Sequence, residues 1–163
     1  MGKIKVKIVN ESTNQLPEYK HQGDSGIDLR AYINGDNTKI IYKAEVTEMN
    51  GKDCIIMQPM GRICVDTGIR VSPPEGVESM VRPRSGLSRD HGIVAMIGTV
   101  DNGYRGTIGV TLINFGEKAF VINDGDRIAQ LVFGKYETAE FEVVEQLDDT
   151  ERGSGGFNST GIK

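Results

Sequence analysis

Short apolar runs recur along almost the whole chain, and turn residues interrupt each of them. The interruptions are clusters such as Asn50-Gly51 and Pro73-Pro74-Glu75-Gly76. No window shows the sustained 3.6-residue apolar period of a long amphipathic helix. Glycine supplies 21 of 163 residues, against roughly 7% in an average protein, and tryptophan is missing. The pattern predicts an all-β sandwich or barrel.

The expected strands cover residues 3–9, 27–33, 39–46, 54–57, 63–71, 77–81, 93–100, 107–114, 118–122, 128–133 and 140–145. We expect one helical turn, at residues 87–92. Asn50-Gly51 and Asn102-Gly103 are each expected to close a tight hairpin, because both residue types tolerate positive φ. With no internal repeat or linker, the sequence predicts one β-domain over residues 1–147. The charged, then Gly/Ser-rich tail at 148–163 is expected to be mobile without ligand.

The formal net charge of −4 argues against broad binding of nucleic acid or an anionic membrane. A polyanion would need a local cluster, for which the candidates are Arg82, Arg84, Arg105, Arg127 and Arg152. The two cysteines and two histidines show no metal-like spacing. No signal peptide or transmembrane run is visible, so a cytoplasmic location is the default expectation.

An acid and an aromatic lie beside the expected hairpin at residues 98–106, which read Gly-Thr-Val-Asp-Asn-Gly-Tyr-Arg-Gly. Strand and turn chemistry do not require Asp101, and a carboxylate held beside a rigid turn can orient a water and accept its proton. The alternative is that Asp101 only bonds nearby backbone N–H groups. Tyr104 has the corresponding structural alternative of cross-strand packing.

Two further segments combine guanidinium, glycine and hydroxyl groups. Residues 82–87 read Arg-Pro-Arg-Ser-Gly-Leu, and Arg84 offers a fork of donors suited to phosphate oxygens. Gly86 lets backbone N–H groups approach an anion closely. The tail at residues 152–161 reads Arg-Gly-Ser-Gly-Gly-Phe-Asn-Ser-Thr-Gly. It could fold over a ligand, with Phe157 stacked on a flat base and with Arg152 and Ser159 near phosphates.

Together these segments resemble the homotrimeric dUTPase family, and all five motifs of that family can be matched in order. They are residues 23–29 (Gly-Asp-Ser-Gly-Ile-Asp-Leu), 83–87, 98–106, 125–131 (Gly-Asp-Arg-Ile-Ala-Gln-Leu) and 152–161. The resemblance runs from about Lys3 to Gly161. It implies a distorted β-barrel of jelly-roll type. It also implies a homotrimer whose three active sites are each built from three chains, with the tail of another subunit acting as a lid.

The reaction implied by the resemblance is Mg²⁺-dependent hydrolysis of dUTP to dUMP and pyrophosphate. Asp101 would activate the water that attacks the α-phosphorus. Asp28 would act on the metal as an outer-shell partner through water. The phosphates would be cradled by Arg84, Ser85, Gly86 and Gln130, with Arg152 joining when the tail closes.

Selection of the base and sugar follows from the same resemblance. Backbone groups at Thr99, Val100 and Gly109 would complement the uracil edge, and a cytosine amino group would leave polar groups unpaired. Tyr104 would lie against the deoxyribose and leave no room for a 2′-hydroxyl. The remaining substrate-contacting positions are Ala95, Gly98, Phe157, Asn158 and Ser159.

Two rival functions share these residues. The related dCTP deaminases need a glutamate on the strand after residues 98–106, and residues 109–114 contain no acid. A dUTP-sensing regulatory protein would bind nucleotide in the same way, and Asp101 favours catalysis over sensing. The chain departs from the family at Asn158, where glycine is usual, and is longer than compact members between Ala31 and Thr67.

Overall fold

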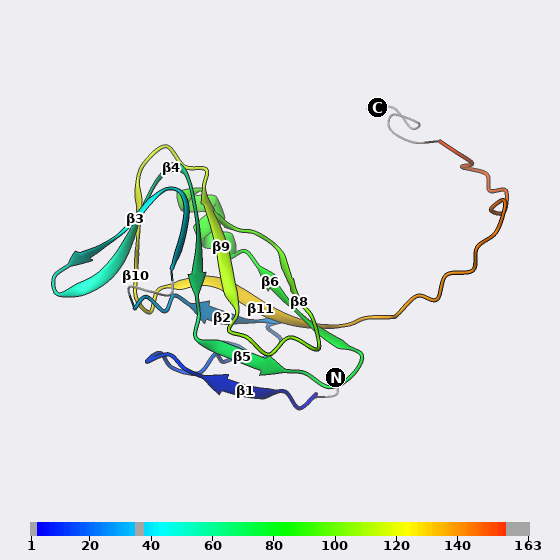
Figure 1. Ribbon diagram of the computed structural model, residues 1–163, viewed down its shortest axis with the longest axis horizontal. Helices are drawn as coiled ribbons and strands as arrows, with labels where there is room; N and C mark the ends of the chain where they lie inside the picture. Colours follow the sequence, from blue (N-terminus) through cyan, green and yellow to red (C-terminus); the bar gives the residue numbers. More distant parts are fainter. Residues whose placement is uncertain (1–2, 35–37, 156–163) are drawn as a thin grey trace.

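The computed structural model describes residues 3–34 and 38–155 of the chain. Strands dominate it and form two sheets and a two-stranded ribbon (Figure 1). Their bounds are β1 Lys7–Asn10, β2 Gly26–Arg30, β3 Lys39–Met49, β4 Lys52–Asp66, β5 Ile69–Ser72, β6 Val77–Arg82, β7 Ile93–Ala95, β8 Gly98–Val100, β9 Gly109–Asn114, β10 Phe120–Asn123 and β11 Arg127–Lys135. A short helix, α1, spans Ser85–His91. The expected all-β, jelly-roll-like fold is confirmed.

The two sheets enclose one apolar core. One sheet has the strand order β10-β4-β9-β7 with β3 paired to β4, and the other has the order β2-β11-β6-β8. Inward-facing side chains of both sheets form the core cluster, including Leu29 and Leu131 from one and Ile63 and Leu112 from the other. Alternation along β2 buries Ile27 and Leu29, and it therefore turns Asp28 to the opposite, outer face.

The expected Asn50-Gly51 hairpin is confirmed. Asn50 and Gly51 have φ of 55° and 74°, which suit a tight turn, and they join β3 to β4. This hairpin projects from the body of the molecule (Figure 1). The apolar runs expected at 54–57 and 63–71 lie mostly in one long strand, β4, which ends at Asp66 before Gly68 turns the chain with φ 64°. Between Ala31 and Thr67 the chain thus forms β3, which pairs with β4.

The prediction of a hairpin at Asn102-Gly103 is wrong. The expected strand at 93–100 divides into β7 and β8, which belong to different sheets: β7 pairs with β9, and β8 pairs with β6. The 101–104 turn instead carries the chain from one sheet to the other. Neither Asn102 nor Gly103 has positive φ, and the Asn102 amide instead donates to the carbonyls of Pro74 and Val77 at 2.8 and 3.0 Å.

The strand expected at 140–145 is also not formed. After β11 the chain leaves the body as an extended segment (Figure 1). Phe141 and Val143 there have exposed fractions of 89% and 97%. The alternating pattern of this segment therefore finds no partner strand among the described residues of its own chain. The first expected strand is shorter than predicted, because only Lys7–Asn10 pairs, with β5.

The helical turn expected at 87–92 is confirmed and begins two residues earlier, at Ser85. Gly92 ends it with φ 69°, and its N–H reaches back to the carbonyls of Leu87 and Ser88. A side chain at Gly92 would also meet the backbone nitrogen of Gly116 at 2.6 Å. At the exposed end of α1, a side-chain hydrogen bond from Arg89 lowers the pKa of the Asp90 carboxyl. No helix among the described residues is long and apolar enough to span a membrane.

Candidate active site

Asp28 holds two arginines from different parts of the chain. Its Oδ1 accepts from Arg84 Nε at 2.9 Å and its Oδ2 accepts from Arg127 Nη1 at 3.1 Å. Arg84 Nη1 also donates to the carbonyl of Arg127 at 3.1 Å. The Asp28 side chain is 29% exposed, so the group is open to ligand. A paired carboxylate fixes two guanidinium groups here, and guanidinium is well suited to phosphate oxygens.

Gln130 lies next to this cluster and fixes the segment that carries Arg84. It is the cross-strand partner of Asp28, from β11 to β2. Its Nε2 donates to the carbonyl of Pro83 at 2.9 Å. Gly26 makes room for it, because a Cβ at that position would collide with the Gln130 amide oxygen and lie 3.1 Å from its Cδ. The first, second and fourth motifs therefore meet at one place on the outer face of the β2-β11-β6 sheet.

Ser85 and Gly86 follow Arg84 directly and begin α1. Both are exposed, and a Cβ placed on Gly86 would meet nothing within 4 Å. Their hydroxyl and backbone groups are accordingly accessible to a ligand held by Arg84.

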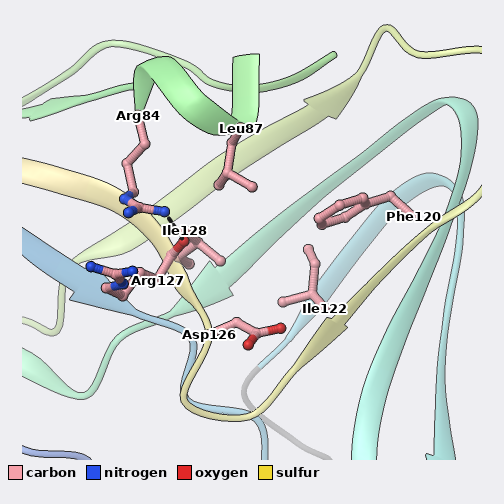
Figure 2. A pocket seen from close by; sticks show the side chains of 7 residues that line it. All are labelled: Arg84, Leu87, Phe120, Ile122, Asp126, Arg127 and Ile128. Carbon is pink, nitrogen blue, oxygen red and sulfur yellow. Dashed lines mark hydrogen bonds between the residues drawn. The ribbon is translucent and has the colours of Figure 1, made fainter. Parts of the chain in front are cut away.

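Two depressions flank the Asp28 cluster. One, of about 250 Å³, is lined by Glu18, Lys20, Asp24, Ser25, Gly26, Asp28 and Gln130. The other, of about 240 Å³, is lined by Arg84, Leu87, Phe120, Ile122, Asp126, Arg127 and Ile128 (Figure 2). In Figure 2 the two guanidinium groups lie at one side of the second depression, while Leu87 reaches down from α1 toward its apolar floor. The first depression is polar and offers oxygen ligands beside the arginines.

The third motif lies elsewhere on the same sheet. Thr99 and Val100 are in β8, opposite Met80 and Ser79 of β6, and Asp101 follows them as an exposed residue. Ala95, in β7, is buried, and Gly98 and Gly109 begin β8 and β9. The residues expected to contact the base therefore lie on both sides of the 101–104 turn in the sequence, where the chain passes between the two sheets.

Asp101 and Arg84 are separated within one chain. Val100 pairs with Ser79, and Asp101 is the next residue after Val100. Arg84 lies five positions after Ser79, just beyond the end of β6. Asp101 continues one position past Val100 toward Glu78, so six positions separate it from Arg84, which is about 20 Å of extended chain at about 3.3 Å per residue. The structure therefore brings Asp28, Arg84 and Gln130 together, and it does not bring Asp101 to them within a single chain.

The tail residues are placed only in part. Arg152 is exposed, and its Nε donates to the carbonyl of Gly155 at 3.1 Å. Among the described residues it forms no hydrogen bond or ion pair with the Asp28 cluster. Phe157, Asn158 and Ser159 lie outside the described residues.

Arg127 is the site residue whose role sequence reasoning missed. It was one of five arginines considered for a polyanion site, and only Arg84 and Arg127 converge on Asp28. Arg105 instead donates to the carbonyl of Asn102 at 2.6 Å. Its place in the fourth motif was the available signal, but side chains three positions apart on a regular strand face opposite ways, and the register of β11 against β2 shifts between Arg127 and Ala129. Glu18 and Lys20 carried no pattern that pointed to the site.

The described residues contain no cluster of three His, Cys, Asp or Glu side chains arranged to hold a metal ion. Oxygen donors are nevertheless present beside Asp28, from Glu18, Asp24 and Ser25. A hard cation that keeps most of its water and binds phosphate oxygens needs few protein ligands. The donor set therefore fits such a cation and does not form a closed protein cage.

Comparisons with known proteins extend over nearly the whole chain. A family model described as dUTPase matches residues 50–161. A deoxyuridine 5′-triphosphate nucleotidohydrolase of Finegoldia magna is 44% identical over 160 residues, covering 97% of this chain and 99% of that protein. The protein of the same name from Fusobacterium nucleatum is 41% identical over 163 residues, covering 99% of both chains.

Solved structures agree in fold. Staphylococcus bacteriophage 80alpha dUTPase with dUPNHPP has a TM-score of 0.78 at 24% identity, covering 97% of this chain and 99% of that one. A variant of the dUTPase from phage phi11 of S. aureus, whose structure concerns the coordination of a structural Mg(II) ion, has a TM-score of 0.71 at 22% identity, covering 89% and 99%. At these identities the structural likeness supports the fold alone.

Proposed function

The chain belongs to the dUTPase family and is a dUTP diphosphatase, and we propose that Asp101 is the general base of its reaction. A water oxygen would attack the α-phosphorus and lose its proton to the Asp101 carboxylate. The bond from the α-phosphorus to the bridging oxygen of the β-phosphate would break, so that dUMP and pyrophosphate are the products. Curated relatives similar over nearly their whole length carry the activity, and the exposed carboxylate of Asp101 beside the 101–104 turn supports its role as the base.

The triphosphate would bind at the Asp28 cluster. Arg84 and Arg127 are already oriented there by one carboxylate, so little side-chain ordering is needed when phosphate arrives. Ser85, Gly86 and Gln130 complete a set of donors around the same place. Arg152 would join these donors from the tail, and Phe157, Asn158 and Ser159 would close over the nucleotide.

Uracil would be read by backbone groups. The N–H and C=O groups that would pair with the base belong to Thr99 and Val100 of β8 and to Gly109 of β9. Asp101 follows Val100 directly in the chain. Ala95 is buried, so a contact there would also use its backbone. Gly98 has no side chain to block this approach. A site whose backbone groups pair with the uracil edge would leave buried polar groups unpaired when cytosine enters. That loss would strongly favour dUTP over dCTP.

Tyr104 would exclude ribonucleotides. Its side chain is 48% exposed, so one surface of the ring remains free to lie against a sugar. A ring in contact with the 2′-carbon of deoxyribose leaves no space for an added hydroxyl.

Mg²⁺ would be held chiefly by the phosphates, next to Asp28, and would neutralise charge on their oxygens. Both Asp28 oxygens already accept from guanidinium groups, so Asp28 would act on the cation through water. The oxygens of Glu18, Asp24 and Ser25 lie on the same side and could accept from that hydration shell.

We propose that the active unit is a homotrimer with shared sites. About 20 Å of extended chain separates the backbone of Asp101 from that of Arg84, which is too far for both to reach one α-phosphorus from the same chain. The exposed apolar side chains of Phe141 and Val143, on a segment that leaves the body, agree with contact to another copy. Each site would then combine the Asp28 cluster of one chain with the third motif of another and the tail of a third.

In the cell this activity would limit uracil incorporation into DNA and supply dUMP for thymidylate synthesis, and we place it in the cytoplasm. It would not need to bind nucleic acid or a membrane directly. A dUTP-sensing role using the same pocket is the alternative, and it predicts nucleotide binding without turnover.

Pyrophosphate release from dUTP, dCTP, dTTP and UTP, each with and without Mg²⁺, tests the proposal. We expect release from dUTP with Mg²⁺ to exceed release from the other three nucleotides by at least about a hundredfold in kcat/KM. Turnover of dCTP to a uracil nucleotide, or tight dUTP binding without release, would contradict it in favour of the two rivals.

A further inference from the structure

Gly106 leaves the space that the end of the Tyr104 ring occupies. A Cβ built on Gly106 would collide with the phenol oxygen, lie 2.6 Å from Cζ and lie 3.1 Å from Cε2 of that ring. No real Cβ lies so close to three atoms of one side chain. The ring of Tyr104 can therefore hold this position only if residue 106 has no side chain.

A hydrogen bond fixes the same end of the ring. The Tyr104 hydroxyl donates to the carbonyl of Thr107 at 3.0 Å. Thr107 is itself tied to the body, since its Oγ1 donates to Asp66 Oδ2 of β4 at 2.8 Å. The acceptor that orients the phenol is thus anchored to a long core strand.

The turn that carries Tyr104 is anchored at its other end as well. The Asn102 amide donates to the carbonyl of Pro74, which lies between β5 and β6, and to that of Val77 at the start of β6. Arg70 Nε donates to the carbonyl of Arg105. The Tyr104 backbone N–H closes the turn by donating to the Asp101 carbonyl at 3.0 Å. Asp101 and Tyr104 therefore belong to one preformed turn, and the ring is held with one surface open.

We propose that Gly106 is a positioning residue for sugar selection, acting through Tyr104. The inference deepens the proposed function and rests on Tyr104 as the steric gate. Excluding one hydroxyl oxygen requires a ring that cannot yield, because a displacement of about 1 Å would admit much of that oxygen. Gly106 and the Thr107 carbonyl supply that fixed position.

The variant Gly106→Ala tests this without unfolding the turn. Gly106 has no positive φ, so its backbone accepts alanine. The colliding atoms are the far end of a side chain, which can swing away while the backbone stays in place. Gly103→Ala is the matched control, since it lies in the same turn, has no positive φ and would place its Cβ in open space.

The measurement is the ratio of kcat/KM for dUTP to kcat/KM for UTP. We expect Gly106→Ala to lower this ratio by about tenfold or more, because a displaced ring no longer fills the space that the added hydroxyl of UTP needs. Gly103→Ala should keep the wild-type ratio. Tyr104→Ala should lower the ratio, and Tyr104→Ala combined with Gly106→Ala should not lower it further, because Gly106 acts only through the ring.

An unchanged ratio in Gly106→Ala, or a ratio that falls equally in Gly103→Ala, would overturn the inference. So would an additional loss in the double variant. Failure of the proposed function looks different, because the wild-type protein itself would then lack dUTP turnover or would cleave UTP equally well.

Discussion

Asp28 is the residue that joins Arg84 to Arg127, and its surroundings differ from what its motif alone indicates. The sequence predicted a carboxylate that acts on a metal through water. The structure adds that both of its oxygens accept from guanidinium groups, of Arg84 and Arg127. Sequence reasoning identified Asp28, Arg84 and Gln130 because they lie in motifs. It missed the role of Arg127 because a pair that joins β2 to β11 depends on strand register, which a linear pattern does not contain.

Arg127→Gln should weaken nucleotide binding more than it weakens folding. The substitution removes one charge-assisted hydrogen bond from Asp28 and one positive charge beside the phosphates, so we expect KM for dUTP to rise by about tenfold. Because Arg127 is half-exposed, the free energy of unfolding should change by no more than about 1 kcal/mol. Steady-state kinetics and thermal unfolding measure the two effects.

Arg89→Gln is the control for this variant, because Arg89 is an exposed arginine paired with Asp90 on α1, outside the Asp28 cluster. Equal changes in KM for the two variants would mean that general surface charge, and not the contact with Asp28, is responsible.

At the scale of elements, local patterns predicted the strands and missed some of their pairings. Asn50-Gly51 forms its hairpin because both residues adopt positive φ and Met49 pairs with Lys52 directly across the turn. Asn102-Gly103 has the same dipeptide character and forms no hairpin, since the Asn102 amide binds distant carbonyls and β8 pairs with β6. The run at 140–145 alternates like a strand and finds no partner strand among the described residues, so it stays unpaired. Such tertiary contacts, or their absence, override local propensity.

Gly61 lies within β4, where the pairing with β3 is irregular, and local sequence could not identify it as essential. Lys43 and Met60 have φ of 47° and 65°, and the pairing of β3 with β4 shifts register between Tyr42 and Ala44. A Cβ on Gly61 would lie 2.5 Å from the Lys43 carbonyl and 2.7 Å from the Gln58 carbonyl. Backbone atoms on both strands therefore require glycine at this irregularity.

Gly61→Ala should consequently destabilise the fold by about 1–3 kcal/mol, because backbone must move to relieve the contact. Chemical denaturation monitored by circular dichroism measures it, with Gly103→Ala as the control in open space. A Gly61→Ala protein as stable as the control would show that the irregular pairing relaxes without cost.

At the scale of the whole molecule, one chain keeps the residues of the proposed active site apart. Asp28 lies on β2 and Asp101 follows β8, which are the two outer strands of one sheet. The described segment after β11 leaves the body (Figure 1). The sequence predicted the fold class and, through its resemblance, a shared site. The sequence could not predict the distance between the Asp28 cluster and Asp101, because that distance follows from the pairing of β8 with β6. Assembly of several chains is the simplest way in which these parts meet.

Deleting residues 152–163 should leave a folded protein of unchanged oligomeric state and remove most catalysis. The deleted segment contains few apolar residues and can contribute little to a core. Its guanidinium and hydroxyl groups would act only once nucleotide is bound. Light scattering and pyrophosphate release measure the two outcomes.

Mixing the tail-deleted chain with Asp101→Asn chains then tests sharing between subunits. Mixed oligomers should contain some sites with an intact base and an intact tail, so activity should reappear after subunit exchange. No recovery, with exchange demonstrated by labelled chains, would place the tail over its own chain's site.

Asp101 is proposed as the base with which this chain hydrolyses dUTP. Single-turnover kinetics of Asp101→Asn test this role most directly. We predict that the rate of pyrophosphate release falls by about 10²–10⁴-fold, because a positioned general base contributes that much. Binding of a non-hydrolysable dUTP analogue should remain within about twofold of wild type, and Asp90→Asn, an exposed carboxylate on α1, should behave as wild type. Near-normal turnover by Asp101→Asn would contradict the account, and loss of turnover only in parallel with loss of binding would reassign Asp101 to substrate binding.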